Sequence, residues 1–280
     1  MRLDPGLYLV ATPIGAARDI TLRALDVLNS ADLLAAEDTR VLRHLMEIHG
    51  LALRGRRIMA IHDHNEEKQA QALSAAIVAG QSVAYCSDAG TPLVADPGFR
   101  LARAVARAGL AIRAVPGASA ALAALSVAGL PSDRFLFAGF APQPVSARRS
   151  WLHEVTSVDA TAIIFDSPRR VKQTLGILCE IDPNRSMVLC RELTKKFEET
   201  MRGTAADIAG LIPDGGLKGE IVLVIDRPAE AAPSEGDIDT ALMALLGEKS
   251  VRDAAAVVAD RFGIARRDAY QRALALERKG

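Results

Sequence analysis

Short apolar runs alternate with amphipathic stretches from the first residues of the chain onward. Segments with helical spacing separate these runs; "ITLRALDVLNSA" follows Asp19 and includes Thr21, either of which can cap a helix. "TRVLRHLMEIHG", "EEKQAQALSAAIVAG" and "GFRLARAVARAG" end in a glycine, as helix C-termini often do. The apolar runs have the length of strands. They lie at 7–11, 33–36, 57–61, 82–86 and 111–115. This alternation predicts a largely parallel α/β sheet.

After Pro131 the pattern changes. "FLFAGF" and "TAIIFD" predict strands, "SPRRVKQTLGILCEI" predicts a helix, and "SMVLCREL" and "GEIVLVI" predict two more strands. Strands that follow one another with few crossover helices indicate a mixed sheet. "DRPAEAAPSEGD" has the composition of a linker. Beyond it the chain is helical, and its middle has the helix, glycine turn and helix of a helix-turn-helix.

The predicted fold class is therefore α/β with two domains and a helical appendage. Residues 1–116 form an N-terminal α/β domain with a parallel-rich sheet, and residues 117–228 form a second, mixed α/β domain. Residues 229–280 form a linker and a helix-turn-helix-like extension.

Composition narrows the function classes without choosing one. Half of the 280 residues are hydrophobic, which supports a large core, whereas only 4% are aromatic. The 34 basic and 34 acidic residues cancel, so the overall charge gives no argument for nucleic acid. Residues 240–280, however, hold eight basic residues against five acidic ones, which suits either a solvated surface or contact with nucleic acid.

The chain carries no sign of export or of membrane insertion. Cys86, Cys179 and Cys190 show no CxxC spacing, and buried, reduced thiols are expected. The first residues lack the apolar core of a secretory signal, and no stretch reaches the roughly 18 apolar residues of a membrane span. We expect a cytoplasmic protein without membrane contact.

The stretch "YCSDAGTPLVADPG" at 85–98 is dense in Gly, Pro and Asp and follows a strand. It lacks the glycine spacings of the dinucleotide and P-loop phosphate cradles. No Lys lies between Lys68 and Lys172, and carboxylates such as Asp88 and Asp96 repel phosphate. Those two acids also lack a recognisable spacing for Mg²⁺, so no metal is predicted. A ligand with hydroxyl and ammonium groups remains, and Asp96 is also expected to cap a helix that starts at Pro97.

Two further strand ends carry loops of the same kind. "ATPIGAARDIT" places Pro13 and Gly15 after the first strand, and "VPGASA" follows another. Ligands of open α/β sheets bind at the carboxyl ends of strands, so these loops predict a shared crevice. The pair His62 and His64 has no third nitrogen or sulfur ligand nearby, which favours hydrogen bonding over metal binding.

These stretches, taken in order, resemble a known family. "LYLVATPIG", "AAEDTR", "HDHNE", "SDAGTPLVADPG", "VPGASAALAALSVAGLP", "FAGFAP", "RELTKKFEE" and "KGEIVLVI" together resemble the 16S rRNA (cytidine-2′-O)-methyltransferase branch of the tetrapyrrole methylase superfamily. The resemblance covers roughly residues 6–226, and the tail is similar to an extension found in many members. One departure stands out, because Ala16 and Ala17 occupy positions where most members have Asn and Leu.

The resemblance implies S-adenosylmethionine as cofactor, bound between two α/β domains of a homodimer, and 16S rRNA or the 30S subunit as partner. It implies a cofactor site that is made mainly of loop residues. These are Pro13, Ser87, Asp88, Ala89, Gly90, Thr91, Val94, Gly117, Ala118, Ser119, Ala120, Asp166, Ser167, Gly219 and Glu220.

A methyl transfer to a ribose hydroxyl benefits from a group that handles its proton. The candidates for this role, or for orienting the ribose, are Asp38, His62, Glu192 and Lys195. Seven basic residues are candidates for contact with RNA phosphates. They are Arg40, Arg148, Arg149, Arg191, Lys196, Arg266 and Arg267.

Three alternatives remain open from the sequence. A methyltransferase of the same fold can act on a tetrapyrrole, although scarce aromatics and the basic tail argue against it. A non-enzymatic nucleic-acid-binding regulator would centre on the helix-turn-helix, but nearly 230 residues precede that segment and hold all the site-like loops. A dehydrogenase is disfavoured because no dinucleotide fingerprint is present.

Overall fold

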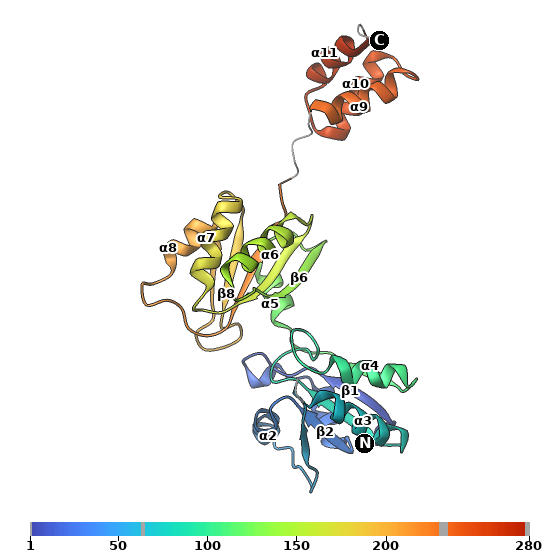
Figure 1. Cartoon of the computed structure of the whole chain (residues 1–280), viewed down its shortest axis with the longest axis vertical. Helices are drawn as coiled ribbons and strands as arrows, with labels where there is room; N and C mark the ends of the chain where they lie inside the picture. The colour runs from blue at the N-terminus through green and yellow to red at the C-terminus, as the bar shows by residue number, and fades with distance from the viewer. Residues whose placement is uncertain (1, 63–64, 230–234, 278–280) are drawn as a thin grey trace. The chain divides into compact units, whose positions relative to one another are not determined.

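The computed structural model describes residues 2–62, 65–229 and 235–277. The chain forms two compact units, Met1–Arg227 and Pro228–Gly280. The first unit contains two five-stranded sheets, and the described part of the second contains three helices (Figure 1). The boundary predicted between residues 116 and 117, inside the first unit, stays a prediction.

The first sheet is entirely parallel, in the order β3-β2-β4-β1-β5. Its strands are β1 (Gly6–Val10), β2 (Leu33–Ala36), β3 (Ile58–Ala60), β4 (Ser82–Cys86) and β5 (Ile112–Val115). The predicted parallel-rich sheet is confirmed. Because all five strands run the same way, the loops that follow them meet at one edge of the sheet.

Helices cover both faces of this sheet, because successive side chains of a continuous apolar run point to opposite faces and both must be buried. Tyr8 and Val10 of β1 belong to the core cluster that includes buried residues of two helices, α1 (Leu22–Ser30) and α2 (Thr39–Ile48). Leu7, on the opposite face, belongs to the cluster with α3 (Glu66–Val78) and α4 (Phe99–Arg107). Thr21, one of the two predicted caps, accepts a hydrogen bond at the start of α1.

The second sheet is mixed, in the order β6-β7-β10-β8-β9, and only the pair β6–β7 is parallel. Its strands are β6 (Phe135–Phe140), β7 (Thr161–Asp166), β8 (Met187–Arg191), β9 (Glu199–Gly203) and β10 (Ile221–Ile225). Four helices pack on it, α5 (Ala120–Ala128) on one face and the other three in the cluster on the opposite face. Those three are α6 (Val145–Ser157), α7 (Val171–Ile181) and α8 (Ala205–Leu211).

The predicted mixed character of the second sheet is confirmed, but four of the elements in or on it, α5, α6, β9 and α8, were not predicted. Helix α6 is a crossover between the parallel strands β6 and β7, a connection that parallel pairing requires. Strand β9 begins at the last residue of "RELTKKFEE", and helix α8 follows β9. The charged residues of this segment leave no apolar run that would mark a strand.

The second unit has its own small core. Its helices are α9 (Glu235–Leu246), α10 (Val251–Phe262) and α11 (Arg266–Glu277), and Leu242, Val258 and Ala269 are buried between them. Gly263 ends α10 with a left-handed φ of 62°, as the helix, glycine turn and helix pattern predicts. Within the described ranges, no helix combines the length and apolar character that crossing a bilayer demands.

Candidate functional site

Three strand-end loops of the first sheet are joined directly. Thr12 and Gly90 exchange two backbone hydrogen bonds of 2.9 and 3.0 Å, which tie the loop after β1 to the loop after β4. The Thr91 hydroxyl donates to the Ala118 carbonyl at 3.0 Å and ties in the loop after β5. The three loops that the sequence assigns to one crevice therefore form one connected structure.

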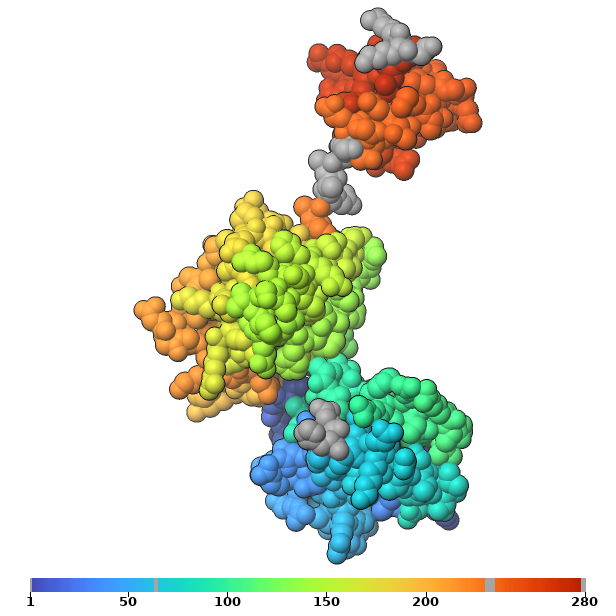
Figure 2. Space-filling model, viewed as in Figure 1, coloured from blue at the N-terminus to red at the C-terminus, as the bar shows by residue number. Residues whose placement is uncertain are grey.

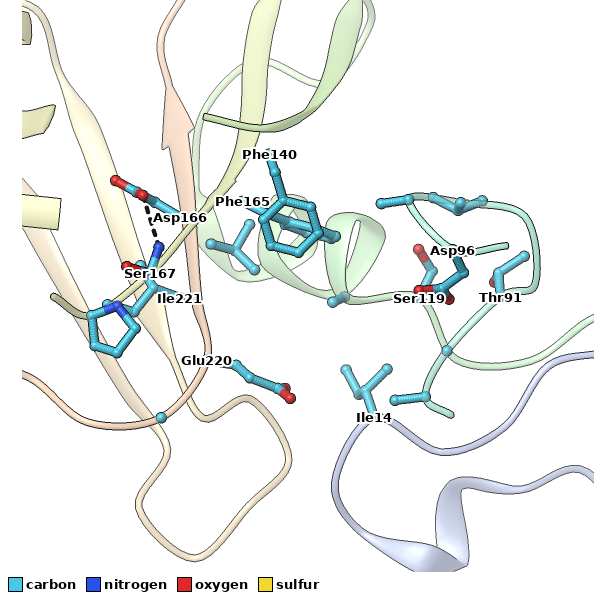
Figure 3. Close-up of a pocket in the computed structure, with 18 residues that line it drawn as sticks. Ile14, Thr91, Asp96, Ser119, Phe140, Phe165, Asp166, Ser167, Glu220 and Ile221 are labelled. Carbon is cyan, nitrogen blue, oxygen red and sulfur yellow. Dashed lines mark hydrogen bonds between the residues drawn. The ribbon is translucent and has the colours of Figure 1, made fainter. Parts of the chain in front are cut away.

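These loops form one wall of a cavity of about 350 Å³ (Figure 3). The other wall comes from the second sheet, from the ends of β6 and β7 and the start of β10. The lining residues are Ile14, Ala89, Gly90, Thr91, Val94, Ala95, Asp96, Ser119, Ala120, Phe140, Phe165, Asp166, Ser167, Pro168, Gly219, Glu220, Ile221 and Val222.

The cavity combines apolar surfaces with acidic groups. The rings of Phe140 and Phe165 meet edge to face with their centroids 5.3 Å apart. Both rings, labelled in Figure 3, belong to the wall that comes from the second sheet. Its acidic members are Asp96, Asp166 and Glu220, and no described residue of the lining is basic. An apolar, acidic cavity disfavours phosphate and suits a flat ligand that carries positive charge.

Ten of the fifteen residues predicted to bind the cofactor line this cavity. They are Ala89, Gly90, Thr91, Val94, Ser119, Ala120, Asp166, Ser167, Gly219 and Glu220. The role of each in binding stays a prediction, but the structure brings them together from four segments of the chain.

The other five predicted cofactor residues lie outside the lining and support it. Ser87 is buried, and its carbonyl accepts a hydrogen bond from the Thr12 hydroxyl. The Asp88 carboxylate accepts from the Asp38 amide at 2.8 Å. Pro13 is half-buried beside Ile14 in the sequence. Gly117 packs so closely on Ala11 that a side chain would lie 3.0 Å from its Cβ, and Ala118 offers the carbonyl that Thr91 uses.

Two apolar members of the lining, Ile14 and Phe140, were not predicted from the sequence. Ile14 lies inside "TPIG", and Phe140 inside "FAGFAP", so both fall in stretches that already stood out. Phe140 is 60% exposed, which is unusual for a phenylalanine and was the missing signal, because exposure cannot be read from one sequence.

Asp96 has a different role from the predicted helix cap. Helix α4 begins at Phe99, two residues later than expected, and Gly98 at its N-cap makes no side-chain cap. The carboxylate of Glu66 takes that position instead and accepts from the amides of Gly98 and Arg100 at 3.1 and 2.6 Å. Asp96 lines the cavity. Burial, together with the nearby charge of Asp88, raises its pKa, and a hydrogen bond from Ser87 only partly offsets this rise.

Asp166 is buried at the end of β7 and fully engaged. It accepts from the Thr174 hydroxyl at 2.6 Å and from the Ser167 amide at 2.7 Å, and the guanidinium of Arg170 lies 3.5 Å away. The interaction with Ser167 fixes the turn that continues the cavity wall, as Figure 3 shows. Asp166 is therefore a rigid part of the site.

Glu192, Lys195 and Glu220 form a charged cluster beside the cavity. The Lys195 ammonium lies 2.9 Å from the Glu192 carboxylate and 3.1 Å from that of Glu220. Glu192 also accepts from the Glu220 amide at 2.9 Å. Gly219 allows this approach, since a side chain there would lie 2.4 Å from Glu192.

The cluster sets the charge of its members. Partial burial alone would lower the pKa of Lys195, but hydrogen bonds with Glu192 and Glu220 outweigh it and raise the pKa. Hydrogen bonding to the Glu220 amide, and then to Lys195, lowers the pKa of Glu192. At neutral pH Lys195 is thus a cation that can donate a hydrogen bond, and Glu192 is its anionic partner.

Asp38 and His62 lie outside the cavity lining. Asp38 caps α2, and its hydrogen bonds with the Arg40 side chain and amide lower its pKa to about 2. A carboxylate with so low a pKa is a weak base, so its use as a proton acceptor is disfavoured. The His62 amide donates to the side chain of Asn65. Asp63 and His64 fall outside the described residues. Elsewhere in the described ranges, no three His, Cys, Asp or Glu residues form a group able to hold a metal.

The candidate RNA contacts divide by exposure. Arg148 corrects the prediction, because it is 1% exposed and donates to the carbonyls of Pro142 and Gln143 and to Gln173 and Thr174. A buried guanidinium with these partners supports the second sheet and cannot reach RNA. Among the others, Arg40, Arg149, Arg191 and Arg266 form ion pairs. Lys196 and Arg267 are exposed.

Comparison with known proteins places this site in context. Residues 6–209 match the family described as Tetrapyrrole (Corrin/Porphyrin) Methylases, and residues 232–277 match the RsmI C-terminal HTH domain. A protein of Mesorhizobium japonicum called ribosomal RNA small subunit methyltransferase I is 46% identical over 98% of this chain and 93% of its own length. The protein of that name from Escherichia coli O157:H7 is 39% identical over 98% of this chain and 96% of its own.

A solved structure shares the fold. The uroporphyrin-III C-methyltransferase of Thermus thermophilus, complexed with S-adenosylhomocysteine, covers 79% of this chain and 97% of its own with a TM-score of 0.53. At 19% identity this likeness concerns the fold alone.

Proposed function

Since the chain belongs to the tetrapyrrole (corrin/porphyrin) methylase family, we propose that it is an S-adenosylmethionine-dependent methyltransferase that acts on ribosomal RNA. The near full-length similarity to two proteins named ribosomal RNA small subunit methyltransferase I supports the substrate class. The finer proposal is 2′-O-methylation of a cytidine ribose in the decoding region of 16S rRNA, and it rests on the motif resemblance of the sequence.

One observation carries the cofactor assignment. The cavity offers apolar and aromatic surface together with the carboxylates of Asp96, Asp166 and Glu220, and no basic side chain among its described residues. S-adenosylmethionine, when bound, supplies a methyl group on a positively charged sulfur. The carboxylates fit its cationic groups and the apolar surface fits its flat adenine, whereas the charge of a nucleotide phosphate would be repelled by the carboxylates.

The residues of the site divide into those that position and those that carry charge. The Thr12–Gly90 pairing and the Thr91–Ala118 hydrogen bond fix the loop wall in place before any ligand arrives. Lys195 sits beside Glu220 at the cavity edge and can donate a hydrogen bond to a ribose oxygen or a phosphate. Because its pKa is raised, we assign it to charge stabilisation instead of proton removal.

Replacing Lys195 by methionine is expected to lower kcat by about 10²–10³-fold and to change S-adenosylhomocysteine binding little. Methionine keeps an unbranched apolar stem against the loop at Gly15, which lies close to the Lys195 side chain, but it removes the ammonium. Methyl transfer measured at saturating substrates tests this. The matched control is Lys172→Met, which removes an exposed ammonium on α7 that is not among the candidate RNA contacts; an equal loss in both variants would contradict the role of Lys195.

The affinity for S-adenosylhomocysteine, whose α-ammonium is cationic, is expected to fall as the pH is lowered through the raised pKa of Asp96. A cation binds the ionised carboxylate, so binding is strongest above that pKa and weakens as Asp96 becomes protonated. Calorimetric titration at several values between roughly pH 4 and pH 8, a range above the ordinary Asp pKa of about 3.9, measures this change in affinity. Asp96→Asn should flatten this dependence, and a wild-type profile kept by the variant would contradict it.

The proposed function is tested by incubating the protein with labelled S-adenosylmethionine and either naked 16S rRNA or 30S subunits, followed by mapping of the methylated nucleotide. A 2′-O-methyl on one cytidine supports the proposal in full. Label on another rRNA position would retain only the substrate class, and label only on a tetrapyrrole, or on nothing, would overturn it.

The assembly and location follow the same resemblance. We propose a homodimer in the cytoplasm, which sedimentation of the purified protein and cell fractionation test. The basic extension, matched by the RsmI C-terminal HTH domain model, is proposed as an additional RNA contact through Arg266 and Arg267.

A further inference from the structure

A surface groove between α3 and α4 lies apart from the cavity described above. It encloses about 490 Å³ and is lined by Glu67, Ala70, Gln71, Arg100, Arg103, Ala104 and Arg107. Figure 1 shows the two helices side by side, and Figure 2 shows the surface of this region in cyan to green; α3 and α4 pack closely. The small side chains of Ala70 and Ala104 leave the hollow, and three arginines from α4 stand along it.

The stability of α4 alone does not account for all three arginines. Arg100, Arg103 and Arg107 follow one another at spacings of three and four residues, so they share a helix face and repel one another. Arg100 lies in the first turn, where the helix dipole disfavours a cation, and α4 itself supplies no acidic residue there. Arg107, in the last turn, is favoured by the helix dipole, but the mutual repulsion of the three remains, and such a row of like charges indicates a surface that meets an anion.

Only one of the three is neutralised by the protein. Arg100 lies 3.7 Å from Glu67 and 4.0 Å from Glu66. Among the residues that the structure describes, Arg103 and Arg107 take part in no ion pair or hydrogen bond, and both are exposed. Two guanidinium groups, with the amide of Gln71 opposite, therefore face solvent along one groove.

The groove is connected to the cavity by a short piece of chain. Asp96 lines the cavity, and α4 begins three residues later at Phe99. From Arg100 to Arg107 the helix rises about 10 Å, so the three arginines form a row along the groove. An RNA strand that brings a ribose to the cofactor at this cavity can continue over α4, which starts three residues after Asp96.

We propose that the groove formed by Arg100, Arg103, Arg107 and Gln71 binds the phosphodiester backbone of the RNA substrate beside the methylated nucleotide. This inference rests on the proposed function for the identity of the RNA. Guanidinium groups bind phosphate oxygens in a forked geometry, and such contacts set register and affinity without reading sequence. The groove is thus a surface that positions the RNA, and none of the seven RNA-contact residues predicted from the sequence belongs to it.

The test compares Arg103→Ala/Arg107→Ala with wild type in binding and methyl transfer, using naked 16S rRNA and 30S subunits as probes. The double variant should bind naked rRNA about tenfold more weakly, and the slope of log affinity against log salt should fall by about 1.4, or 0.7 for each lost phosphate contact. The KM for RNA should rise, while kcat and the affinity for S-adenosylhomocysteine stay unchanged.

Arg23→Ala/Arg43→Ala is the matched control, because these two exposed arginines belong to α1 and α2, whose buried residues pack on the opposite face of the sheet. An equal loss of RNA affinity in both double variants would show that only the net charge of the protein matters, and it would overturn the proposal. So would a loss confined to 30S subunits, which would indicate a ribosomal protein as partner. If wild type methylates no RNA, the proposed function itself fails, whereas unchanged binding in an active Arg103/Arg107 variant refutes the groove alone.

Discussion

Replacement of Glu66 by alanine is expected to lower the free energy of unfolding by about 3–5 kcal/mol. Its carboxylate is buried and accepts from the amides of Gly98, Arg100 and Leu101 at 3.1, 2.6 and 3.3 Å. Alanine leaves these donors without their acceptor, two of them in buried positions, and it removes the anion from the N-terminus of α4. Denaturant unfolding followed by far-UV circular dichroism measures the loss.

Two substitutions bracket the cause of this loss. Glu66→Gln keeps one acceptor oxygen and loses the charge, so it should cost about 1–2 kcal/mol. Glu67→Ala removes the adjacent, exposed carboxylate, whose pair with Arg100 is a surface ion pair, and should change stability by less than about 1 kcal/mol. A Glu67→Ala variant as unstable as Glu66→Ala would show that the amide contacts are not responsible.

The buried Glu66 shows where reading the sequence fails. Its position in "HNEE" indicates a solvated helix start, because Glu is rarely buried and its partners lie more than thirty residues away in sequence. Asp96, by contrast, stands directly before Pro97 and satisfies every local rule for a cap. The local rule failed because the carboxylate of Glu66, distant in sequence, accepts the hydrogen bonds at the start of α4 instead.

The first sheet was predictable because its strands are short apolar runs, and parallel strands buried on both faces must be continuous in this way. The second sheet was predicted in character but not in full. Strand β9, "ETMRG", is an edge strand with one buried residue, so neither alternation nor an apolar run marks it. Helix α6 buries Arg148, a residue that any sequence pattern assigns to the surface.

The candidate site was predicted best where the backbone determines it. The loops around Gly90 and Ser119 were found because glycine and small residues at strand ends mark a close approach, whereas Gly219 was implied only by the family resemblance. The aromatic pair Phe140 and Phe165 was missed, since nothing in one sequence separates a core phenylalanine from one that lines a cavity. Arg103 and Arg107 were missed for a similar reason, because a helical arginine row is usually solvated surface and only the groove and the lack of described partners distinguish it.

Replacement of Gly90 by valine is expected to abolish the thermal stabilisation by S-adenosylhomocysteine and to reduce methyl transfer at least about 100-fold. Gly90 has a φ of 78°, and a Cβ there would lie 3.3 Å from the side chain of Ile14, inside the cavity wall. A β-branched residue both strains this backbone and pushes the two joined loops apart.

Gly109→Val is the control for strain alone, because Gly109 has a φ of 68° with open space around it. Both variants should lose about 1–2 kcal/mol of stability, and only Gly90→Val should lose the ligand-induced shift in Tm. If both variants retain the shift, the loop after β4 does not form the cofactor site.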